Sequence, residues 1–257
     1  MNVETDHVEL TIENVSVSFP IYYGGSRSLK RSLLFRGSGG HLANDANHRV
    51  VVEALRGVTT QIRAGDRVAL VGSNGAGKTT LLRVMAGIYE PVVGTVKSRG
   101  RISPMFDIGL GIDSETSGYE NIRMRGLILG MTRQEIEAQM QDIVDFTELG
   151  DYLDIPVRTY SSGMMARLTF AIATCFSPEI LLMDEWIMAG DASFMSKARH
   201  RIEGFVAKAS ILVLASHSLE TCRQFCNKAL WMEQGQIRSA GPIEDILAAY
   251  LRQSEAA

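Results

Sequence analysis

The stretch "GSNGAGKT", residues 72–79, decides the fold of this chain. It follows the apolar run "RVALV" and precedes "LLRVMAG", so it lies between a predicted strand and a predicted helix. It matches the pattern G-x-x-x-x-G-K-[ST], in which the backbone N–H groups of a glycine-rich loop surround a nucleotide phosphate. A full match in this strand–loop–helix context predicts an α/β nucleotide-binding core.

The side chains of this phosphate loop also have expected roles. Lys78 supplies a positive charge between the β- and γ-phosphates, and Thr79 supplies a hydroxyl for Mg²⁺. A tight turn without a ligand is the alternative, and the complete match in the right context speaks against it. The residues expected to contact the nucleotide are Gly72, Ser73, Asn74, Gly75, Ala76, Gly77, Lys78, Thr79 and Thr80.

A second stretch, "ILLMDE" at residues 180–185, is an apolar strand that ends in two carboxylates. Asp184 is expected to hold Mg²⁺ through water, and Glu185 to polarise the attacking water as a general base. Alone, this pattern is typical of many strand ends, but beside a phosphate loop it favours nucleotide hydrolysis. The stretch "NKAL", residues 227–230, lacks the aspartate of an N-K-x-D guanine motif, which favours ATP over GTP.

The stretch "YSSGMMARLTFAIA", residues 160–173, predicts a second helix that begins at an anion-binding end. Ser161 and Ser162 are good N-cap residues, Gly163 lets a ligand approach the backbone, and an apolar helix follows. Because the phosphate loop is already complete earlier in the chain, the residues alone leave open which phosphate this helix binds.

Composition excludes several classes of protein. The 257 residues are 46% hydrophobic and 21% charged with a net charge of −3, which gives no electrostatic case for nucleic acid as a partner. No apolar run approaches the about 20 residues that cross a bilayer, and the acidic N-terminus "MNVETDHVEL" is no signal peptide. We therefore expect a cytoplasmic chain. The cysteines, which have no metal-binding or disulfide pattern and are expected to pack, are Cys175, Cys222 and Cys226.

Periodicity predicts the remaining elements. Alternating or apolar runs predict strands over residues 8–19, 50–62, 67–72, 179–185 and 210–217. Helices are expected to begin at Lys78 and Ser218 and to cover residues 192–209 and 242–252. A helical block is expected over residues 118–176, and hairpins over residues 94–104 and around Gln234 and Gly235. The helical block is thus inserted between the first phosphate helix and the next core strand.

In their order along the chain, these motifs resemble those of ABC-type ATPases, and "YSSGM" is similar to the signature motif of that family. The resemblance implies that Asp191, in "MAGDASF", is the D-loop aspartate. It implies that His217, in "LASHS", contacts the γ-phosphate. It also implies that Phe19 stacks on adenine, with Tyr22 and Tyr23 as competing candidates.

The resemblance extends from residue 8 to about residue 250. It implies one ABC-type nucleotide-binding domain over residues 1–257, with the P-loop NTPase fold, a RecA-like core, an antiparallel β-subdomain and a helical subdomain at about 115–176. In that family two such domains pack head to tail, so the second anion site binds the ATP of the partner. The residues that contact ATP in this way are then Ser161, Ser162 and Gly163.

One branch of the family fits best. In "SPMFDIGLGIDSETSGYENI", residues 103–122, Asp107 falls where the family usually has a glutamine, and a carboxylate there still ligates Mg²⁺. This stretch and "YSSGM" are similar to the polysaccharide-exporter branch, which serves O-antigen, capsule, teichoic acid or cell-wall galactan. The resemblance implies a homodimeric ATPase beneath a homodimeric membrane permease, at the cytoplasmic face of the inner membrane, that moves a lipid-linked glycan.

Residues 20–49 form a predicted irregular insertion that is basic in a chain of net negative charge. Its stretch "SRSLKRSLLFR" predicts a short helix capped by Ser26, which either faces an anionic lipid or covers its own domain. The basic residues, set against the single acid Asp45, are Arg27, Lys30, Arg31, Arg36 and Arg49.

Other functions stay open at this point. The alternatives are the ATPase of another ABC exporter for lipids or drugs, the ATPase of an importer, and a soluble ABC-type switch. We expect no C-terminal carbohydrate-binding domain in this chain, because it ends at Ala257, directly after the last predicted helix.

Overall fold

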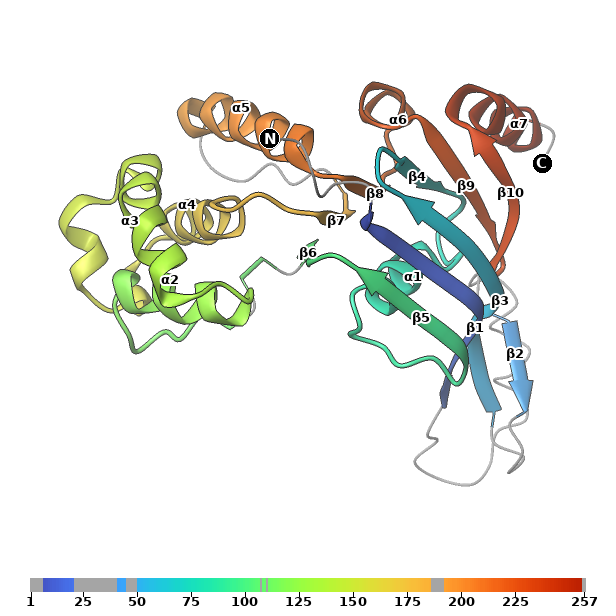
Figure 1. Cartoon of the computed structure of the whole chain (residues 1–257), viewed down its shortest axis with the longest axis horizontal. Helices are drawn as coiled ribbons and strands as arrows, with labels where there is room; N and C mark the ends of the chain where they lie inside the picture. Colours follow the sequence, from blue (N-terminus) through green and yellow to red (C-terminus); the bar gives the residue numbers. More distant parts are fainter. Residues whose placement is uncertain are drawn as a thin grey trace. The chain divides into compact units, whose positions relative to one another are not determined.

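The computed structural model in Figure 1 describes residues 7–20, 41–44, 50–106, 108–109, 111–185 and 192–255. Most of the basic insertion, including the helix expected from Ser26, lies outside the described residues. The prediction of an irregular segment is wrong at one place, because strand β2 (His41–Asn44) pairs there with β3 (Val50–Arg63). Four residues are too few for an alternation of apolar and polar residues to predict such an edge strand.

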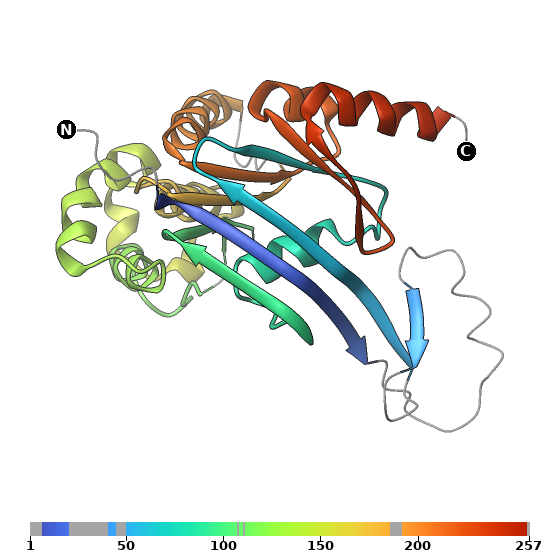
Figure 2. The same ribbon diagram turned by 45° about the vertical axis from the view of Figure 1, so that its right-hand side comes forward.

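An antiparallel sheet of four strands in the order β2-β3-β1-β5 contains β1 (Glu9–Pro20) and β5 (Val93–Arg99). Leu10 and Ile12 of β1 are fully buried and Thr11 between them is half-buried, as the period of two requires. The register against β3 shifts between Ile12 and Val15, and the buried positions continue at Val15 and Val17. Figure 2 shows the long strands β1 and β3 side by side. The strands predicted over residues 8–19 and 50–62 are confirmed.

A second sheet has six strands in the order β10-β9-β4-β8-β7-β6. Its central strands β4, β7, β8 and β9 run parallel, and they are apolar almost throughout because both faces of a parallel sheet are covered. The strands of this sheet are β4 (Arg67–Val71), β6 (Ile102–Met105), β7 (Ile180–Asp184), β8 (Ile211–Ala215), β9 (Lys228–Glu233) and β10 (Gln236–Pro242).

The hairpin predicted over residues 94–104 is wrong. The turn at Gly100 is present, with a φ of 117°, but β5 pairs with β1 in the first sheet and β6 belongs to the second sheet. An alternating pattern shows that a segment is extended and does not show which strand it pairs with. The other predicted hairpin, β9–β10 with its turn at Gln234 and Gly235, is confirmed.

Three helices accompany these sheets. Helix α1 (Lys78–Met85) begins at the predicted residue and contacts β7 and β8 of the second sheet as well as β3 of the first. Helix α6 (Leu219–Phe225) is capped by Ser218, and α7 (Ile243–Glu255) packs on β9 and β10. Cys222 lies in α6, and Cys226 is the buried residue that ends it, so both cysteines pack as expected.

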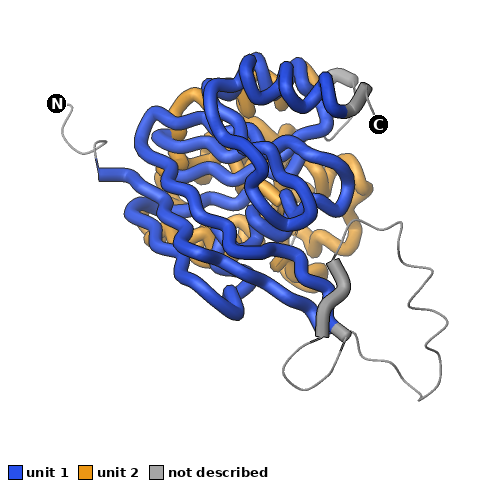
Figure 3. The backbone as a smooth tube through the Cα atoms, turned by 90° about the vertical axis from the view of Figure 1, so that its right-hand side faces the viewer, with its two compact units in different colours: residues 1–104, 180–186, 210–257 blue, residues 105–179, 187–209 orange. Residues whose placement is uncertain are grey.

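The chain divides into two compact units, coloured separately in Figure 3. The first unit, residues 1–104, 180–186 and 210–257, contains the strands and helices described so far, except that β6 ends in the second unit. The second unit, residues 105–179 and 187–209, is helical. Its elements are α2 (Gly118–Ile128), α3 (Arg133–Thr147), η2 (Gly150–Asp154), η3 (Val157–Thr159), α4 (Ser162–Ala173) and α5 (Ala192–Lys208).

Two helices of the second unit begin at capping motifs that are visible in the sequence. Helices α2 and α3 each begin with a capping box, in which Ser117 pairs with Glu120 and Thr132 with Glu135. An aromatic cluster joins three of its helices, because the ring of Phe146 in α3 lies 5.9 Å from that of Phe170 in α4 and 5.1 Å from that of Phe194 in α5. None of the helices within the described ranges is long and apolar enough to cross a membrane.

Candidate nucleotide-binding site

The phosphate loop joins β4 to α1 and packs against other strands so closely that only glycine fits at two positions. Gly77 has a φ of 103°, and a Cβ on it would lie 2.8 Å from the carbonyl oxygen of Ala54 in β3. A Cβ on Gly72 would collide with the carbonyl of Met232 in β9. Neighbouring strands therefore shape the loop, in a conformation that residues with a side chain rarely adopt.

Lys78 is the first residue of α1, and its side chain folds back across the loop. It is only 8% exposed, and its Nζ donates to the carbonyl oxygens of Gly72 at 2.7 Å and Ser73 at 3.1 Å. Burial lowers the pKa of the Lys78 ammonium, against the opposing effect of the Asp184 and Glu185 carboxylates. Because hydrogen bonds to charged acceptors are stronger than those to carbonyls, a phosphate can replace these loop carbonyls as the partner of Lys78.

Two carboxylates lie at the end of β7. Asp184 is the last residue of the strand, and Glu185 comes next with a φ of 71°, its N–H donating to the carbonyl of Ala215 at 2.8 Å. A positive φ is uncommon outside glycine and costs about 1–3 kcal/mol, so the fold maintains this turn against its local preference.

His217 completes this group of side chains. Its Nε2 lies 3.5 Å from Oε1 of Glu185, and the two side chains are 60% and 53% exposed. The first unit thus brings together four of the predicted site residues, since Lys78 is also within electrostatic range of both carboxylates. An exposed carboxylate beside a histidine is accessible to water, as a general base for hydrolysis has to be.

The side-chain oxygen atoms near the phosphate loop are suitable ligands for Mg²⁺. The exposed Thr79 and the half-buried Asp184 offer hydroxyl and carboxylate oxygens, which are the hard ligands that this ion prefers. Over the described part of the chain, no three His, Cys, Asp or Glu side chains gather into a metal site of their own. Asp107 and Asp191 lie outside the described residues.

Phe19, the predicted adenine-stacking residue, lies near the end of β1 and is 37% exposed. Its ring meets that of Tyr89 edge to face, with the centroids 5.2 Å apart and an angle of 71° between the planes. The Tyr89 hydroxyl accepts a hydrogen bond from Arg83 of α1 at 3.0 Å. Sequence analysis did not identify Tyr89, because nothing in its local pattern marks it as a partner of Phe19. Tyr22 and Tyr23 lie outside the described residues.

The signature stretch lies in the second unit and has the predicted helix start. Ser161 is the N-cap of α4, and its Oγ accepts from the backbone N–H of Met164 at 3.2 Å. Ser161 and Ser162 are exposed, and a Cβ on Gly163 would find no heavy atom nearer than the Oγ of Ser161 at 3.9 Å. The first N–H groups of a helix have no acceptor within it, so this open end attracts anions.

Residues from elsewhere in the second unit fix this helix start. The Tyr160 hydroxyl donates to the carbonyl of Tyr152 at 2.6 Å, and burial raises the pKa of Tyr160 to about 12, so it stays a donor. Glu148 pairs with Arg167 of α4 at 3.5 Å and with Lys197 of α5 at 2.7 Å. A cavity of about 280 Å³ lies beside the helix start and is lined by Glu148, Leu149, Tyr152, Ser161, Gly163, Met164 and Arg167.

The sequence of this chain is similar to a family profile and to known proteins. The ABC transporter family profile matches residues 55–188. The chain is 43% identical over 228 residues to the O-antigen export system ATP-binding protein of Yersinia enterocolitica, covering 89% of this chain and 95% of that protein. It is 38% identical over 197 residues to the teichoic acids export ATP-binding protein of Enterococcus faecalis, covering 77% of this chain but only 44% of that protein.

Solved structures show the same fold at lower identity. An ATP-binding subunit of an ABC transporter superposes with a TM-score of 0.65 at 20% identity, covering 94% of this chain and 92% of that one. A dimeric ATP-binding cassette in a post-hydrolysis state, bound to ADP and Pi, gives a TM-score of 0.62 at 18% identity, covering 91% and 98%. These likenesses confirm the fold that residues 72–79 predict.

Proposed function

Because this chain belongs to the ABC transporter family, we propose that it is the ATP-hydrolysing subunit of an exporter that moves a lipid-linked polysaccharide. One observation supports hydrolysis most directly, namely the gathering of Lys78, Asp184, Glu185 and His217 at the phosphate loop. The nature of the cargo is supported by the 43% identity to an O-antigen export protein of which this chain covers 95%.

The residues of the first unit have distinct roles in this proposal. The N–H groups of residues 72–79 and the ammonium of Lys78 bind the β- and γ-phosphates. Thr79 and Asp184, with Asp107, hold Mg²⁺, which supplies positive charge to the phosphate oxygens when bound. Glu185 accepts a proton from the attacking water, and His217 contacts the γ-phosphate while its Nε2 stays within reach of Glu185.

The remaining ATP contacts act between two copies of the chain. Ser161, Ser162 and Gly163 bind the γ-phosphate that the partner's loop holds. The exposure of Ser161 and Ser162 at the start of α4 supports this role, as does the room beside Gly163, where a Cβ would come no nearer than 3.9 Å to the Oγ of Ser161. Asp191 belongs to the same interface. ATP then stabilises the closed homodimer, and its hydrolysis removes that stabilisation. Phe19 stacks on the adenine of the copy to which it belongs.

The partners follow from the exporter proposal. Residues 1–257 act as one nucleotide-binding domain, with residues of about 115–176 as its helical subdomain. Two copies bind a homodimeric membrane permease at the cytoplasmic face of the inner membrane. ATP and Mg²⁺ are the cofactors, and a net charge of −3 gives no electrostatic case for nucleic acid as a partner.

Deleting this gene, with its neighbours intact, tests the proposal. We expect a lipid-linked polymer to accumulate inside the cell and the surface glycan to disappear, as measured by mass spectrometry of polyprenyl-diphosphate-linked glycans. Wild-type protein supplied in trans restores export, while the matched Glu185→Gln variant does not. An unchanged lipid-linked pool and a normal surface would contradict polysaccharide export and would favour another exporter, an importer or a soluble switch.

A further inference from the structure

The turn between β9 and β10 lies directly against the phosphate loop. The backbone N–H of Gly235 donates to the carbonyl oxygen of Ala76 at 3.0 Å, and Ala76 is only 2% exposed. Ala76 is in the middle of the loop, one residue before Gly77. A turn near the C-terminal end of the chain therefore supports the loop that is expected to wrap the β-phosphate.

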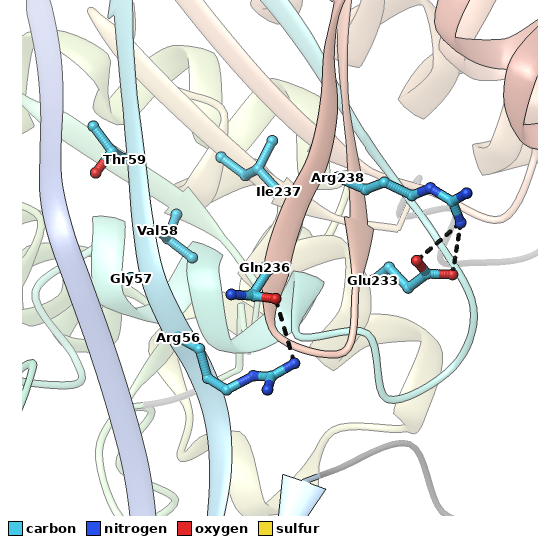
Figure 4. Close-up of a pocket in the computed structure, with 8 residues that line it drawn as sticks. All are labelled: Arg56, Gly57, Val58, Thr59, Glu233, Gln236, Ile237 and Arg238. Carbon is cyan, nitrogen blue, oxygen red and sulfur yellow. Dashed lines mark hydrogen bonds and ion pairs between the residues drawn. The ribbon is translucent and has the colours of Figure 1, made fainter.

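Arg56 of β3 holds this turn with both its backbone and its side chain. Its N–H donates to the carbonyl of Gly235 at 2.8 Å. Its guanidinium donates to the carbonyl of Gln234 from Nε at 3.1 Å and from Nη2 at 2.9 Å. Figure 4 shows the third contact, from Nη2 to the side chain of Gln236 at 3.5 Å. One residue thus fixes the turn residues and the first residue after them.

The turn has little freedom to find another position. Gln234 and Gly235 have φ values of 47° and 77°, the paired positive values of the two-residue hairpin turn that matches strand twist. A Cβ on Gly235 would lie 2.7 Å from the carbonyl oxygen of Ala54, the same atom that a Cβ on Gly77 would approach. Residues 54–56 of β3 therefore support the turn and the phosphate loop together.

We propose that Arg56 is a positioning residue for ATP binding, which keeps the phosphate loop in its binding form by clamping the Gln234–Gly235 turn against Ala76. The inference rests on the proposed role of residues 72–79 in nucleotide binding. Arg56 acts through the turn, and its guanidinium bonds to the turn and not to the loop. Loss of the clamp weakens the hydrogen bond from Gly235 to Ala76 and widens the range of loop conformations from which ATP has to select.

The chain offers a matched control in Arg238 of β10. Arg56 and Arg238 line the same open cavity of about 390 Å³, so removing either side chain leaves no void in the core. Arg238 binds the Glu233 carboxylate at 2.9 Å and 3.1 Å and lies over the Trp231 ring at 4.3 Å. Figure 4 shows Arg238 bonded to Glu233, apart from Arg56 and Gln236. Arg238→Ala therefore controls for the general effect of removing an arginine side chain from this cavity.

The test compares Arg56→Ala with Arg238→Ala in the full chain, after circular dichroism has shown both to be folded. We expect Arg56→Ala to raise the Kd and KM for ATP about tenfold, with kcat at saturating ATP nearly unchanged, because only the binding form of the loop becomes rarer. In the nucleotide-free protein, hydrogen exchange should accelerate over residues 72–79 as well as at the turn. Arg238→Ala should leave ATP affinity and loop exchange as in the wild type.

A second variant keeps the test decisive. Arg56→Lys retains a charged donor for the carbonyl of Gln234 and should recover part of the affinity, whereas a purely structural role would not distinguish the two substitutions. Equal ATP affinity and equal loop exchange in Arg56→Ala and Arg238→Ala would overturn the inference. If the wild type itself bound no ATP, the proposed function would fail, while hydrogen exchange over residues 72–79 would still decide whether Arg56 holds the loop.

Discussion

The two predicted phosphate-binding segments of this protein are built in opposite ways. In the phosphate loop, Gly77 faces the carbonyl of Ala54 at a distance that excludes a side chain, and Lys78 is 8% exposed. At the start of α4, Ser162 is exposed, and a Cβ on Gly163 would come no nearer than 3.9 Å to the Oγ of Ser161. The first segment needs neighbouring strands to hold its shape. The second is held by its Ser161 cap and by contacts to Tyr152 and Glu148, and it presents its N–H groups outward. An outward site suits a phosphate that another molecule holds.

Ser162→Arg should have the largest effect, because it should abolish hydrolysis while the phosphate loop still binds ATP. A guanidinium at the exposed helix start blocks the partner's ATP, so we expect phosphate release to fall below detection. ATP binding by the monomer should stay within about twofold of wild type, because the phosphate loop belongs to the other unit. Phosphate release and an ATP titration on the same preparation measure both quantities. Loss of both in a folded protein would show that the two segments do not divide the work in this way.

Glu185→Gln should separate chemistry from closure. The amide keeps the size of the side chain but cannot accept the proton, so kcat should fall about 10²–10⁴-fold while ATP still binds and drives dimerisation. Steady-state hydrolysis and size-exclusion chromatography with ATP measure the two effects. The control is Glu220→Gln, an exposed carboxylate on α6 that should change neither. Hydrolysis at a near-normal rate in Glu185→Gln would show that another group is the base.

Two matched glycine substitutions test the difference in packing between the phosphate loop and the start of α4. Gly77→Ala places a methyl 2.8 Å from a backbone carbonyl at a φ of 103°, so ATP affinity should be lost and the free energy of unfolding should fall by about 1–3 kcal/mol. Gly163→Ala makes only an ordinary van der Waals contact with the Oγ of Ser161 at 3.9 Å, and alanine favours a helix over glycine by up to about 1 kcal/mol. Its stability and monomer ATP binding should persist while hydrolysis drops, because the methyl faces the partner's phosphate.

Chemical denaturation and ATP titration of the two alanine variants check this expectation. A stability loss of equal size in both would mean that the start of α4 is as tightly packed as the phosphate loop. The difference between the loop and the helix start would then be absent in solution.

Cysteine labelling gives the smallest expected effect and reports on each unit separately. Burial raises the pKa of Cys175 in the second unit and of Cys222 in the first to about 11. At pH 8 both thiols are therefore protonated as well as buried, and alkylation requires local opening. In single-cysteine variants that also carry Ser162→Arg, ATP should slow the alkylation of Cys222 more than that of Cys175. Equal slowing, measured by mass spectrometry, would indicate that one ATP stabilises both units.

Local patterns predicted the local structure around the candidate site well. The glycine spacing of residues 72–79 predicted the strand–loop–helix arrangement, and α1 begins at Lys78 as expected. Ser161 caps α4, and the apolar run before Asp184 is a buried strand of the parallel sheet. These features depend on residues within one turn of a helix or one strand, so a short stretch of sequence contains all the information they need.

Long-range partners could not be predicted from such stretches. The alternation over residues 94–104 indicated extended chain, yet β5 and β6 belong to different sheets. The contact between the rings of Tyr89 and Phe19 also depends on how segments that are distant in the sequence pack together, which no local pattern predicts. A period of two identifies a strand and its buried face, but the choice of neighbour depends on burial across the whole unit.

By itself, the sequence determined the strand–loop–helix at residues 72–79, the buried strand that ends at Asp184 and the helix capped by Ser161, because each is encoded by adjacent residues. Only the tertiary structure decided how the loop is held. Arg56 reaches the carbonyl of Gln234 across 178 residues, and Ala215 stabilises the positive φ of Glu185 from a neighbouring strand. Local propensity fixes which segments can form, whereas the hydrogen bonds that keep a strained loop or turn in place come from distant strands packed around it.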